Sequence, residues 1–480
     1  MIRARGLLRE HWLFCVVFMV GVLLRAAMQR AFGPALFYLG DSFDYLDSAY
    51  KLHWDEAHPN GYPLILAVLA LPGYSLTVIS VTQHLAGLGV GVLCYALLLH
   101  LRVHRFVAAV AAALVLLNSW QIVLEQHVMA ESFFILALVA SVYLVVTRDG
   151  PRATAVSGLL MGAAALIRGA GLFAGPVWLA YAVWKRRARR AAAVAAVAVA
   201  LPIVGYCALH AADGRGFALT QWDGWLLYGR VGQLADCRVV DVSEDLRPLC
   251  ESPAQSERRR AQGWTPSEYI FNPYSPPHRL YGPYVTVGPN PILRRFALEV
   301  IRERPLDYVR VVATDTTYFF RPAGWRIGFD PGIVLHEQRE FPWKNTPNPV
   351  VRRYFPGTEI AKAWPMDAVV DYSRYTRPPR PLLAALMIAA LVSLVLALGG
   401  RGRIRLPHQP ESTFLAGLAL AMLVGSTATV ELNLRFLVPA VPLIACAGAV
   451  ALTDLGALSL GTVRARRRGV AGASQYDPSP

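Results

Sequence analysis

Long apolar blocks constrain this chain more than any other feature of its sequence. Each block has about fifteen to twenty-five residues, and a helix needs about 20 residues to cross a hydrocarbon core. The 480-residue chain is 55% hydrophobic and only 16% charged, whereas soluble domains carry about 25% charged residues. The sequence therefore predicts an integral membrane protein. It excludes a soluble globular enzyme, a small disulfide scaffold and a disordered chain.

Basic residues gather at the ends of these apolar blocks, although the formal net charge of +15 could suggest a nucleic-acid partner. A stripe of arginines along one face would indicate nucleic-acid binding, whereas clusters at block ends follow the positive-inside rule of membrane insertion. The clusters are Arg3/Arg5/Arg9, Arg102/Arg105, Arg148/Arg152, Lys185 to Arg190, Arg401/Arg403/Arg405 and Arg464 to Arg468. We therefore expect no nucleic-acid partner, and we expect both chain ends to lie in the cytoplasm.

The blocks and the basic clusters together predict ten membrane-spanning helices. Eight are expected at about 12–29, 75–101, 106–122, 130–147, 191–210, 381–399, 413–430 and 436–454. Two shorter spans are expected between Arg152 and Lys185, broken at the turn Ile167 to Gly171, because both flanks of that stretch are basic. The first span could be a signal peptide, but no small-residue cleavage site follows it, so we expect an uncleaved helix.

This topology divides the chain into four parts. They are an N-terminal transmembrane catalytic module (1–210, with a first outer loop at 30–74), an extracytoplasmic loop domain (211–379), C-terminal transmembrane helices (380–460) and a cytoplasmic tail (461–480). The loop domain lacks clear periodicity over much of its length, so a mixed or irregular fold is expected there. Within it, Asn290 to Pro322 has helical spacing with a break at Pro305, which predicts two consecutive helices.

The six cysteines test the sidedness of this topology. Cys237 and Cys250 are the two that lie in the loop domain, and the other four lie inside apolar blocks. In an oxidising compartment two cysteines thirteen residues apart would close a loop. The alternative is two unrelated thiols.

The first outer loop contains candidate functional residues. Asp41, Asp44 and Tyr45 share one face if residues 42–51 are helical. The simpler interpretation is that Asp41 caps the helix N-terminus and that Asp44 is only solvated.

A second group of candidates lies where apolar blocks begin or break. Glu131 opens one block, Arg168 interrupts another, and Arg435 begins the last. Each has an ordinary explanation, since an acid favours a helix start and an arginine can extend toward lipid headgroups. However, ionisable groups at membrane depth are costly and usually face a polar cavity. Two acids and two arginines on one side of the membrane would suit an anionic lipid headgroup beside a carboxylate base.

Five short motifs in order resemble the GT-C integral membrane glycosyltransferases. The branch that they resemble contains the protein O-mannosyltransferases and the lipid A aminoarabinose transferases, known in bacteria as phospholipid-carrier-dependent glycosyltransferases. The motifs are Asp41-Ser42-x-x-Tyr45-x-x-x-Ala49, Pro59-Asn60-Gly61-Tyr62-Pro63-Leu64, Met129-Ala130-Glu131-Ser132, Leu166-Ile167-Arg168-Gly169 and Arg435-Phe436-Leu437-Val438-Pro439. One departure is His58, where the family pattern has arginine.

The resemblance implies an all-α polytopic GT-C-like fold and a defined activity. Such enzymes move a sugar, with inversion, from a polyprenyl-phosphate donor to a hydroxyl acceptor at the outer face of the plasma membrane. It implies that Asp41 is the general base and Glu131 a second catalytic acid. It also implies substrate-binding roles for a further set: Asp44, Tyr45, His58, Tyr62, Arg168 and Arg435.

Several alternatives stay open at this point. Some relatives with pyrophosphate donors use a divalent cation such as Mg²⁺ or Mn²⁺, although we expect no metal here. The acceptor could be a glycan, a lipid or a protein, and the sugar a hexose or a pentose. A non-catalytic cell-envelope assembly protein, or a lipid transporter or flippase, would share the same architecture, but the sequence has no internal repeat typical of a transporter.

Overall fold

The computed structural model describes residues 9–186, 189–322, 334–337, 348–399 and 406–473. These residues form helices and connecting segments, and the one β-type pairing among them is an isolated parallel bridge between Leu36 and His127. Some residues used in the topology prediction lie outside the described ranges: Arg3, Arg5, Arg401, Arg403, Arg405 and the tail residues 474–480.

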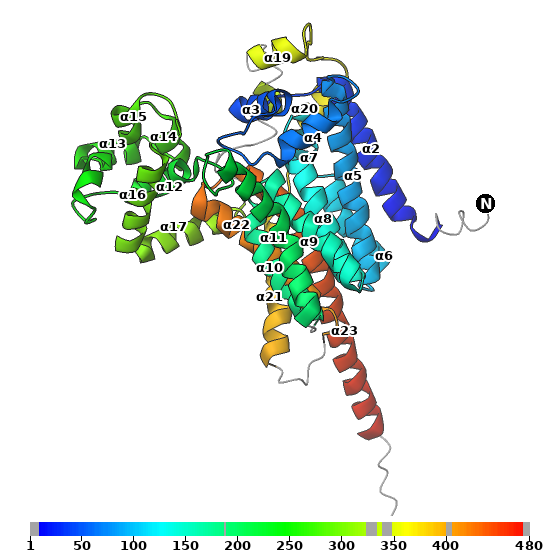
Figure 1. The fold of residues 1–480 in the computed structure, drawn as a ribbon. Coiled ribbons are helices and arrows are strands. Elements are labelled where there is room, and N and C mark those ends of the chain that lie inside the picture. Colours follow the sequence, from blue (N-terminus) through cyan, green and yellow to red (C-terminus); the bar gives the residue numbers. More distant parts are fainter. Residues whose placement is uncertain (1–8, 187–188, 323–333, 338–347, 400–405, 474–480) are drawn as a thin grey trace, which may run out of the picture.

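A bundle of long helices makes up most of the molecule (Figure 1). Its members are α2 (Trp12–Phe32), α5 (Leu76–His100), α6 (Arg105–Leu116), α7 (Ser119–Gln126), α8 (Glu131–Thr147), α9 (Pro151–Ile167), α10 (Gly171–Arg186), α11 (Arg189–Ala212), α21 (Arg380–Gly399), α22 (Gln409–Thr429), the 3₁₀-helix η4 (Leu434–Ala440) and α23 (Val441–Ala473). The all-α polytopic fold predicted from the sequence is thus confirmed.

Each of the ten predicted spans coincides with a helix or a helix pair of the bundle. Six helices are long and apolar enough to cross a membrane, and a seventh span is formed if α6 and α7, which meet at a bend of 44°, are counted as one. By contrast, α8 and α9 have 17 residues each. The number of ten crossings therefore stays a prediction.

Four short helices lie together at one end of the bundle, which we call the rim (Figure 1). They are α3 (Leu39–Lys51), α4 (Gly61–Leu69), α19 (Pro349–Tyr354) and α20 (Met366–Tyr375). With nine residues, α4 is too short to cross a bilayer. It begins directly against the end of α9, because a Cβ atom at Gly61 would lie 2.4 Å from the Leu166 carbonyl oxygen. Only glycine permits this approach, which fixes the segment 30–74 beside Arg168.

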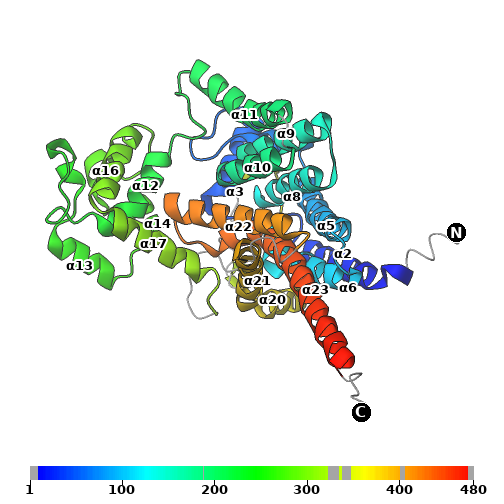
Figure 2. The ribbon, with the colours of Figure 1, turned by 90° about the horizontal axis from the view of Figure 1, so that it is seen from below.

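A separate helical unit projects sideways from the bundle (Figures 1 and 2). It contains α12 (Asp223–Val231), η1 (Gly232–Leu234), η2 (Glu244–Leu249), α13 (Pro253–Ala261), α14 (Pro266–Phe271), α15 (Pro276–Tyr281) and α16 (Asn290–Glu303), with α17 (Pro305–Tyr318) leading back to the bundle. Trp225, Tyr228 and Phe296 are among the buried side chains of its own core. The described part of this insert is helical, whereas the sequence predicted a mixed or irregular fold.

Two local predictions for the insert agree with the structure. Helices α16 and α17 are separated at Arg304-Pro305, as the spacing indicated. Cys237 and Cys250 form a disulfide, with their Cα atoms 5.7 Å apart.

The stretch 211–379 contributes to two hydrophobic cores. Its first part builds the insert, but Phe319, Val351 and Val370 are buried in the core of the bundle. Helix α19 packs against α3, and α20 packs against α2 and α7. The chain thus returns from the insert and completes the rim with α19 and α20 before it enters α21.

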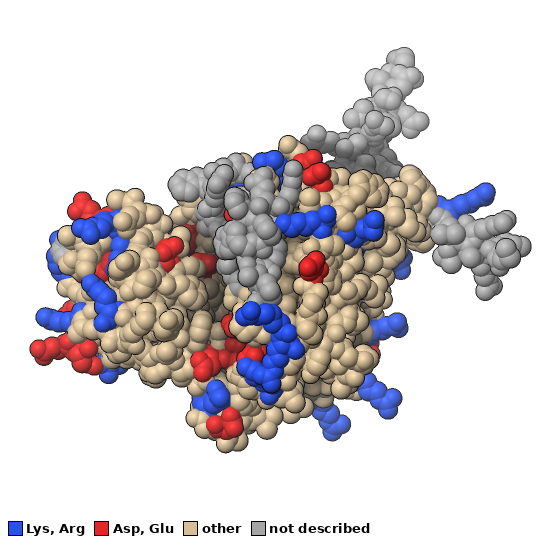
Figure 3. All heavy atoms as spheres, turned by 90° about the horizontal axis from the view of Figure 1, so that it is seen from above, with Lys and Arg blue, Asp and Glu red and all other residues tan. Residues whose placement is uncertain are grey.

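The face of the molecule that carries the rim has a mixed charge distribution (Figure 3). Acidic and basic side chains are interspersed there, and most of the visible surface is neither. A continuous basic stripe, the usual footprint of a nucleic-acid site, is not seen on the described part of this face.

Candidate functional site

Helix α3 carries Asp41 to the end of the bundle. The helix begins at Leu39 with Tyr38 as its N-cap residue, so Asp41 lies in the first turn and not at the cap. Ser42 fixes this turn: its Oγ accepts a hydrogen bond from the Tyr38 backbone N–H (2.7 Å) and donates one to the Val128 carbonyl (2.9 Å). The segment before α8 and the start of α3 are therefore tied together, three residues before Glu131.

Asp41, Arg435, Glu131 and Arg168 form one continuous cluster of alternating charge. Arg435 Nη1 donates to Asp41 Oδ2 at 2.7 Å, and Arg435 Nε lies 3.5 Å from Glu131 Oε1. Arg168 forms an ion pair with the same oxygen of Glu131. The Glu131 side chain is 1% exposed, whereas that of Asp41 is 24% exposed. The cluster thus reaches from the interior of the bundle to solvent.

Local structure and aromatic rings hold both arginines inward. Arg168 follows the last residue of α9, and Arg435 lies in η4, where its backbone N–H is capped by Asn433 Oδ1 at 3.0 Å. Both guanidinium groups lie over the Phe436 ring, at 5.4 and 5.6 Å from its centroid, and Arg435 also lies 4.9 Å from the Tyr38 ring. Cation–π contacts and ion pairs at this depth fix the position of each charge. The alternative interpretation is that these arginines only reach toward lipid headgroups. It does not fit their side chains, which are largely buried and paired with Glu131 and Asp41.

The arginines set the charge of Asp41. Burial by itself would raise the pKa of this carboxyl group, but Arg435 and, to a smaller extent, His58 outweigh burial and lower its pKa. Asp41 is therefore ionised at neutral pH, as a general base must be before it accepts a proton.

His58 connects Asp41 to a residue that the sequence prediction missed. Its Nε2 lies 3.9 Å from Asp41 Oδ1, and its Nδ1 lies 3.1 Å from Asp55 Oδ2. Burial lowers the pKa of His58, but the hydrogen bond and charge of Asp55 raise it further, so that the net shift is upward. Protonated His58 supplies a cation where the family pattern has arginine. In the sequence, this pair was indicated only by an acidic residue three positions before the histidine.

Two tyrosines line the inner side of His58. The Tyr45 ring lies 4.6 Å from the His58 ring and meets the Tyr62 ring edge-on at 4.9 Å. The Tyr62 hydroxyl donates to Gln83 Oε1 at 2.7 Å, which anchors the pair to α5. The structure therefore places both predicted tyrosines beside the charged cluster.

Asp44 lies on the exposed face of α3, one turn after Asp41. Desolvation and repulsion from the Asp55 carboxylate raise its pKa to about 6. Among the charged residues predicted for the site, Asp44 is the one that makes no ion pair in the described part of the structure.

The donor set does not fit a divalent cation. Asp41 and Glu131, the acids that would hold one, both contact the Arg435 guanidinium. Among the described residues, no group of three or more His, Cys, Asp or Glu side chains is arranged to hold a metal ion. No catalytic step is therefore assigned to a metal.

The insert touches the bundle next to two site residues. Ser267 Oγ at the start of α14 donates to Glu431 Oε2 at 2.6 Å, and Glu431 Oε1 accepts from Asn433 Nδ2 at 3.3 Å. The Gln221 N–H, just before α12, donates to the Glu56 carbonyl at 2.8 Å. Glu431 is four positions before Arg435 in the chain, and Glu56 is two positions before His58. The insert therefore borders the candidate site.

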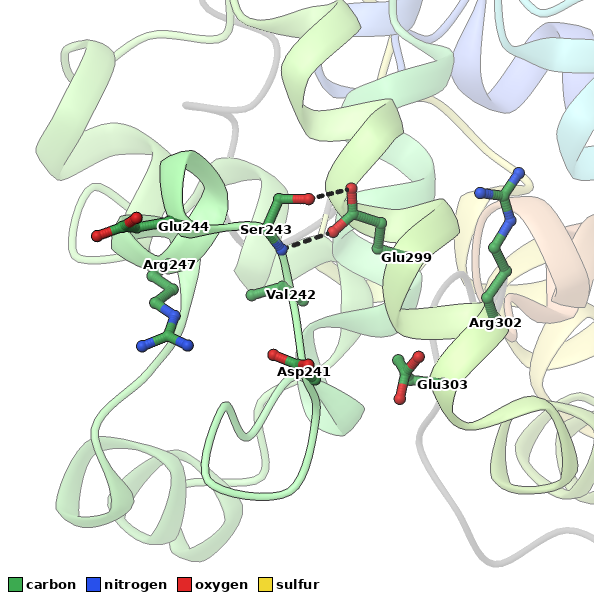
Figure 4. A pocket seen from close by; sticks show the side chains of 8 residues that line it. All are labelled: Asp241, Val242, Ser243, Glu244, Arg247, Glu299, Arg302 and Glu303. Carbon is green, nitrogen blue, oxygen red and sulfur yellow. Dashed lines mark hydrogen bonds between the residues drawn. The ribbon is translucent and has the colours of Figure 1, made fainter.

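The insert also contains an open polar pocket of about 540 Å³ between residues 241–247 and α16 (Figure 4). Its lining residues are Asp241, Val242, Ser243, Glu244, Arg247, Glu299, Arg302 and Glu303. Glu299 is already engaged, because it accepts hydrogen bonds from the N–H and the Oγ of Ser243, each at 2.9 Å. This pocket contains none of the residues of the charged cluster.

Part of the helical bundle matches a known protein family. Residues 76–208 match the family model described as dolichyl-phosphate-mannose-protein mannosyltransferase. This segment includes Glu131 and Arg168, but Asp41, His58 and Arg435 lie outside it. The match supports the resemblance inferred from the sequence, that of a membrane glycosyltransferase of the GT-C superfamily that uses a lipid-phosphate donor.

No curated protein matches the chain. A similar solved structure is the archaeal oligosaccharyltransferase AglB from Archaeoglobus fulgidus, in complex with an inhibitory peptide and a dolichol-phosphate. It is 11% identical with a TM-score of 0.39, and the match covers 98% of this chain and 53% of that chain. This chain therefore spans about half the length of that protein, and so remote a likeness places no residue of the site.

Proposed function

We propose that this protein transfers a sugar from a polyprenyl-phosphate donor to a hydroxyl group of an acceptor, with inversion, and that Asp41 is the general base. The observation that carries this proposal is the cluster in which an ionised, partly exposed carboxylate lies beside two inward-facing arginines. A carboxylate suits proton removal from a hydroxyl group, and fixed guanidinium groups suit the phosphate that departs.

The reaction is a single displacement at the anomeric carbon. The acceptor oxygen attacks that carbon while Asp41 takes the hydroxyl proton. The bond between the anomeric carbon and the phosphate oxygen breaks, and both of its electrons remain on the polyprenyl phosphate. Arg168 and Arg435 stabilise the negative charge that develops there, in a site where burial strengthens the interaction. One displacement inverts the anomeric configuration.

Glu131 acts in this proposal as a buried counter-charge. It contacts both Arg168 and Arg435 and so holds the two guanidinium groups near each other before the donor binds. Without it, two like charges at low dielectric would repel each other. Tyr45, Tyr62 and His58 then form the wall of the site nearest to the first outer loop.

The charge distribution supports placing this site on the outer side of the plasma membrane. Arg105 and Arg186 mark the ends of α6 and α10 that lie opposite the rim, as the course of these helices indicates (Figure 1). Under the positive-inside rule those ends are cytoplasmic. The rim, with Asp41 and Arg168, then faces outward.

A test of this proposal uses membranes that contain the protein and a series of radiolabelled polyprenyl-phosphate sugars. The expected result is that one labelled sugar appears in a glycan, lipid or protein acceptor with the wild-type chain and not with Asp41→Asn. If the protein had only a non-catalytic assembly role, Asp41→Asn would not change the amount of label in the acceptor. Label that moves across the membrane without entering any acceptor would instead indicate a transporter.

A further inference from the structure

A second charged cluster lies deeper inside the bundle, and the proposed reaction does not use it. Arg25 lies in the middle of α2, and Glu125 lies near the end of α7; their side chains are 3% and 0% exposed. Ionisable groups inside a membrane-spanning segment are costly, and those that occur generally have a function. A buried ion pair is also weak evidence for stability, because apolar residues of similar volume often replace it without loss.

The contacts of Glu125 are specific on every side. Arg25 Nε lies 2.8 Å from Glu125 Oε2, and Arg25 Nη2 donates to Oε1 at 2.9 Å. His84 of α5 bridges two residues, with Nδ1 2.9 Å from Glu125 Oε2 and Nε2 2.9 Å from Gln126 Oε1. A Cβ atom at Gly87 would lie 1.7 Å from Glu125 Oε1, so the glycine leaves the space that this carboxylate occupies.

Hydrogen bonds continue from this cluster along the chain toward Glu131. Gln83 Nε2 donates to the carbonyl groups of Glu125 (2.8 Å) and His127 (2.6 Å). Leu36 pairs with the same segment, since its N–H donates to the Gln126 carbonyl and its own carbonyl accepts from the Val128 N–H, both at 2.9 Å. The segment 125–128 is therefore held by α2, by α5 and by the chain that leads into α3.

The proposed base Asp41 and its buried neighbour Glu131 both depend on this segment for their position. Val128 accepts the hydrogen bond from Ser42, the neighbour of Asp41, and α8 begins three residues later at Glu131. Gln83 also accepts from the Tyr62 hydroxyl, which ties the wall of the site to the same point. A shift of residues 125–128 would thus move Asp41 and Glu131 relative to each other.

We propose that Arg25, Glu125 and His84 are positioning residues that set the distance between Asp41 and Glu131 through the segment 125–128. This inference rests on the proposed function. Catalysis is sensitive to such distances, because a displacement of about 1 Å can cost on the order of 100-fold in rate. Hydrophobic packing has no direction, whereas these directed bonds fix the register of the end of α7 and of the two residues that follow it.

The test compares Glu125→Gln with Glu411→Gln in the full-length, membrane-embedded protein. Glu411 is a matched control, since it is a carboxylate of the bundle that accepts a hydrogen bond from Tyr181 (3.1 Å) but lies at the start of α22, away from the rim. Turnover per folded molecule, the KM for the donor and backbone amide exchange are measured for each variant.

For Glu125→Gln we expect turnover to fall by about 10- to 100-fold, the range for a small displacement of catalytic groups. The KM for the donor should change by less than about twofold, because Arg168 and Arg435 are retained. Amide exchange should rise at residues 126–131 and 36–42 and not elsewhere. Glu411→Gln should leave turnover and exchange at these residues unchanged.

Unchanged turnover in folded Glu125→Gln would overturn the inference, and so would a rise in exchange spread over the whole bundle. If Glu125→Gln does not fold, His84→Phe gives a second test, because it removes the bridge from Glu125 to Gln126 and keeps the Arg25 ion pair. It should raise exchange in the same two segments, and an unchanged exchange pattern would overturn the inference. The exchange measurement needs no turnover, so it stays valid even if Asp41→Asn retains transfer and the proposed function fails.

Discussion

Arg435 donates a hydrogen bond to Asp41 at 2.7 Å, and these two residues are 394 positions apart in the chain. The contact joins the first outer loop to the segment that opens the last membrane helix. It also means that the proposed base is ion-paired with an arginine. A donor phosphate that engages Arg435 would loosen this pair and leave Asp41 available to the acceptor hydroxyl group.

Replacing Asp41 with Asn should abolish transfer while the protein still inserts and folds. Loss of a general base costs about 100- to 10,000-fold in rate. Asp47→Asn is a suitable control, because Asp47 lies on the same helix and pairs only locally with Lys51 and His53. Initial rates in washed membranes, normalised to folded protein, measure the effect. Equal rates for the two variants would contradict the role of Asp41.

Replacing Arg435 with Gln should change both the rate and its pH dependence. Turnover should fall by about 100-fold or more, as for removal of one group that stabilises a developing oxyanion. Arg435 lowers the pKa of Asp41, so its removal should raise that pKa. A base must be deprotonated, and the acidic limb of the pH–rate profile should therefore move to higher pH. An acidic limb that stays in place would show that Arg435 does not control the ionisation of the base.

Replacing His58 with Arg should preserve activity and extend it to higher pH. The pKa of His58 is raised in the folded protein, so its ion pairs with Asp55 and Asp41 are present below its ordinary pKa and are lost as the pH rises through the raised value. Arginine remains charged throughout this range. In the pH–rate profile of His58→Arg, the fall in activity at alkaline pH that the wild-type protein shows should thus be absent. His58→Leu should have low activity at all pH values.

Replacing Ser267 with Ala should weaken the contact between the insert and the bundle without unfolding either. The hydrogen bond from Ser267 to Glu431 would be lost, and Glu431 would hold Asn433 and the start of η4 less firmly. We expect turnover to fall by about threefold to tenfold, which corresponds to about 0.7–1.4 kcal/mol, the net contribution of a typical hydrogen bond. Ser252→Ala, which removes an exposed hydroxyl group elsewhere in the insert, should have no effect.

Removing the disulfide should destabilise the insert and spare the bundle. Closing a loop of this length stabilises a fold by about 3 kcal/mol. Cys237→Ser with Cys250→Ser should therefore make residues 223–303 sensitive to limited proteolysis at lower temperature, and a reducing agent should do the same to the wild-type protein. Proteolysis that spreads equally into the bundle helices would argue that the insert does not unfold as a separate unit.

Part of the site was predictable because its residues lie at recognisable points of the sequence. Glu131 and Arg168 mark the ends of apolar blocks, and Asp41 follows the first one. Asp55 was missed because a carboxylate in a polar loop has no periodic signal, and its role depends on the side chain it faces. Arg25 was missed because one arginine within an apolar block does not reveal its partner.

Hydrophobic length and charge placement are local properties of a chain. They were therefore enough to predict a helical membrane protein, the positions of most of its helices, and the charges that were candidates for chemistry. Three features follow only from the folded structure: Arg435 meets Asp41, Glu125 meets Arg25, and the stretch 211–379 supplies both an insert and the rim helices α19 and α20. These contacts join residues between about 100 and 400 positions apart. Their geometry depends on how whole helices pack, and no local pattern contains that information.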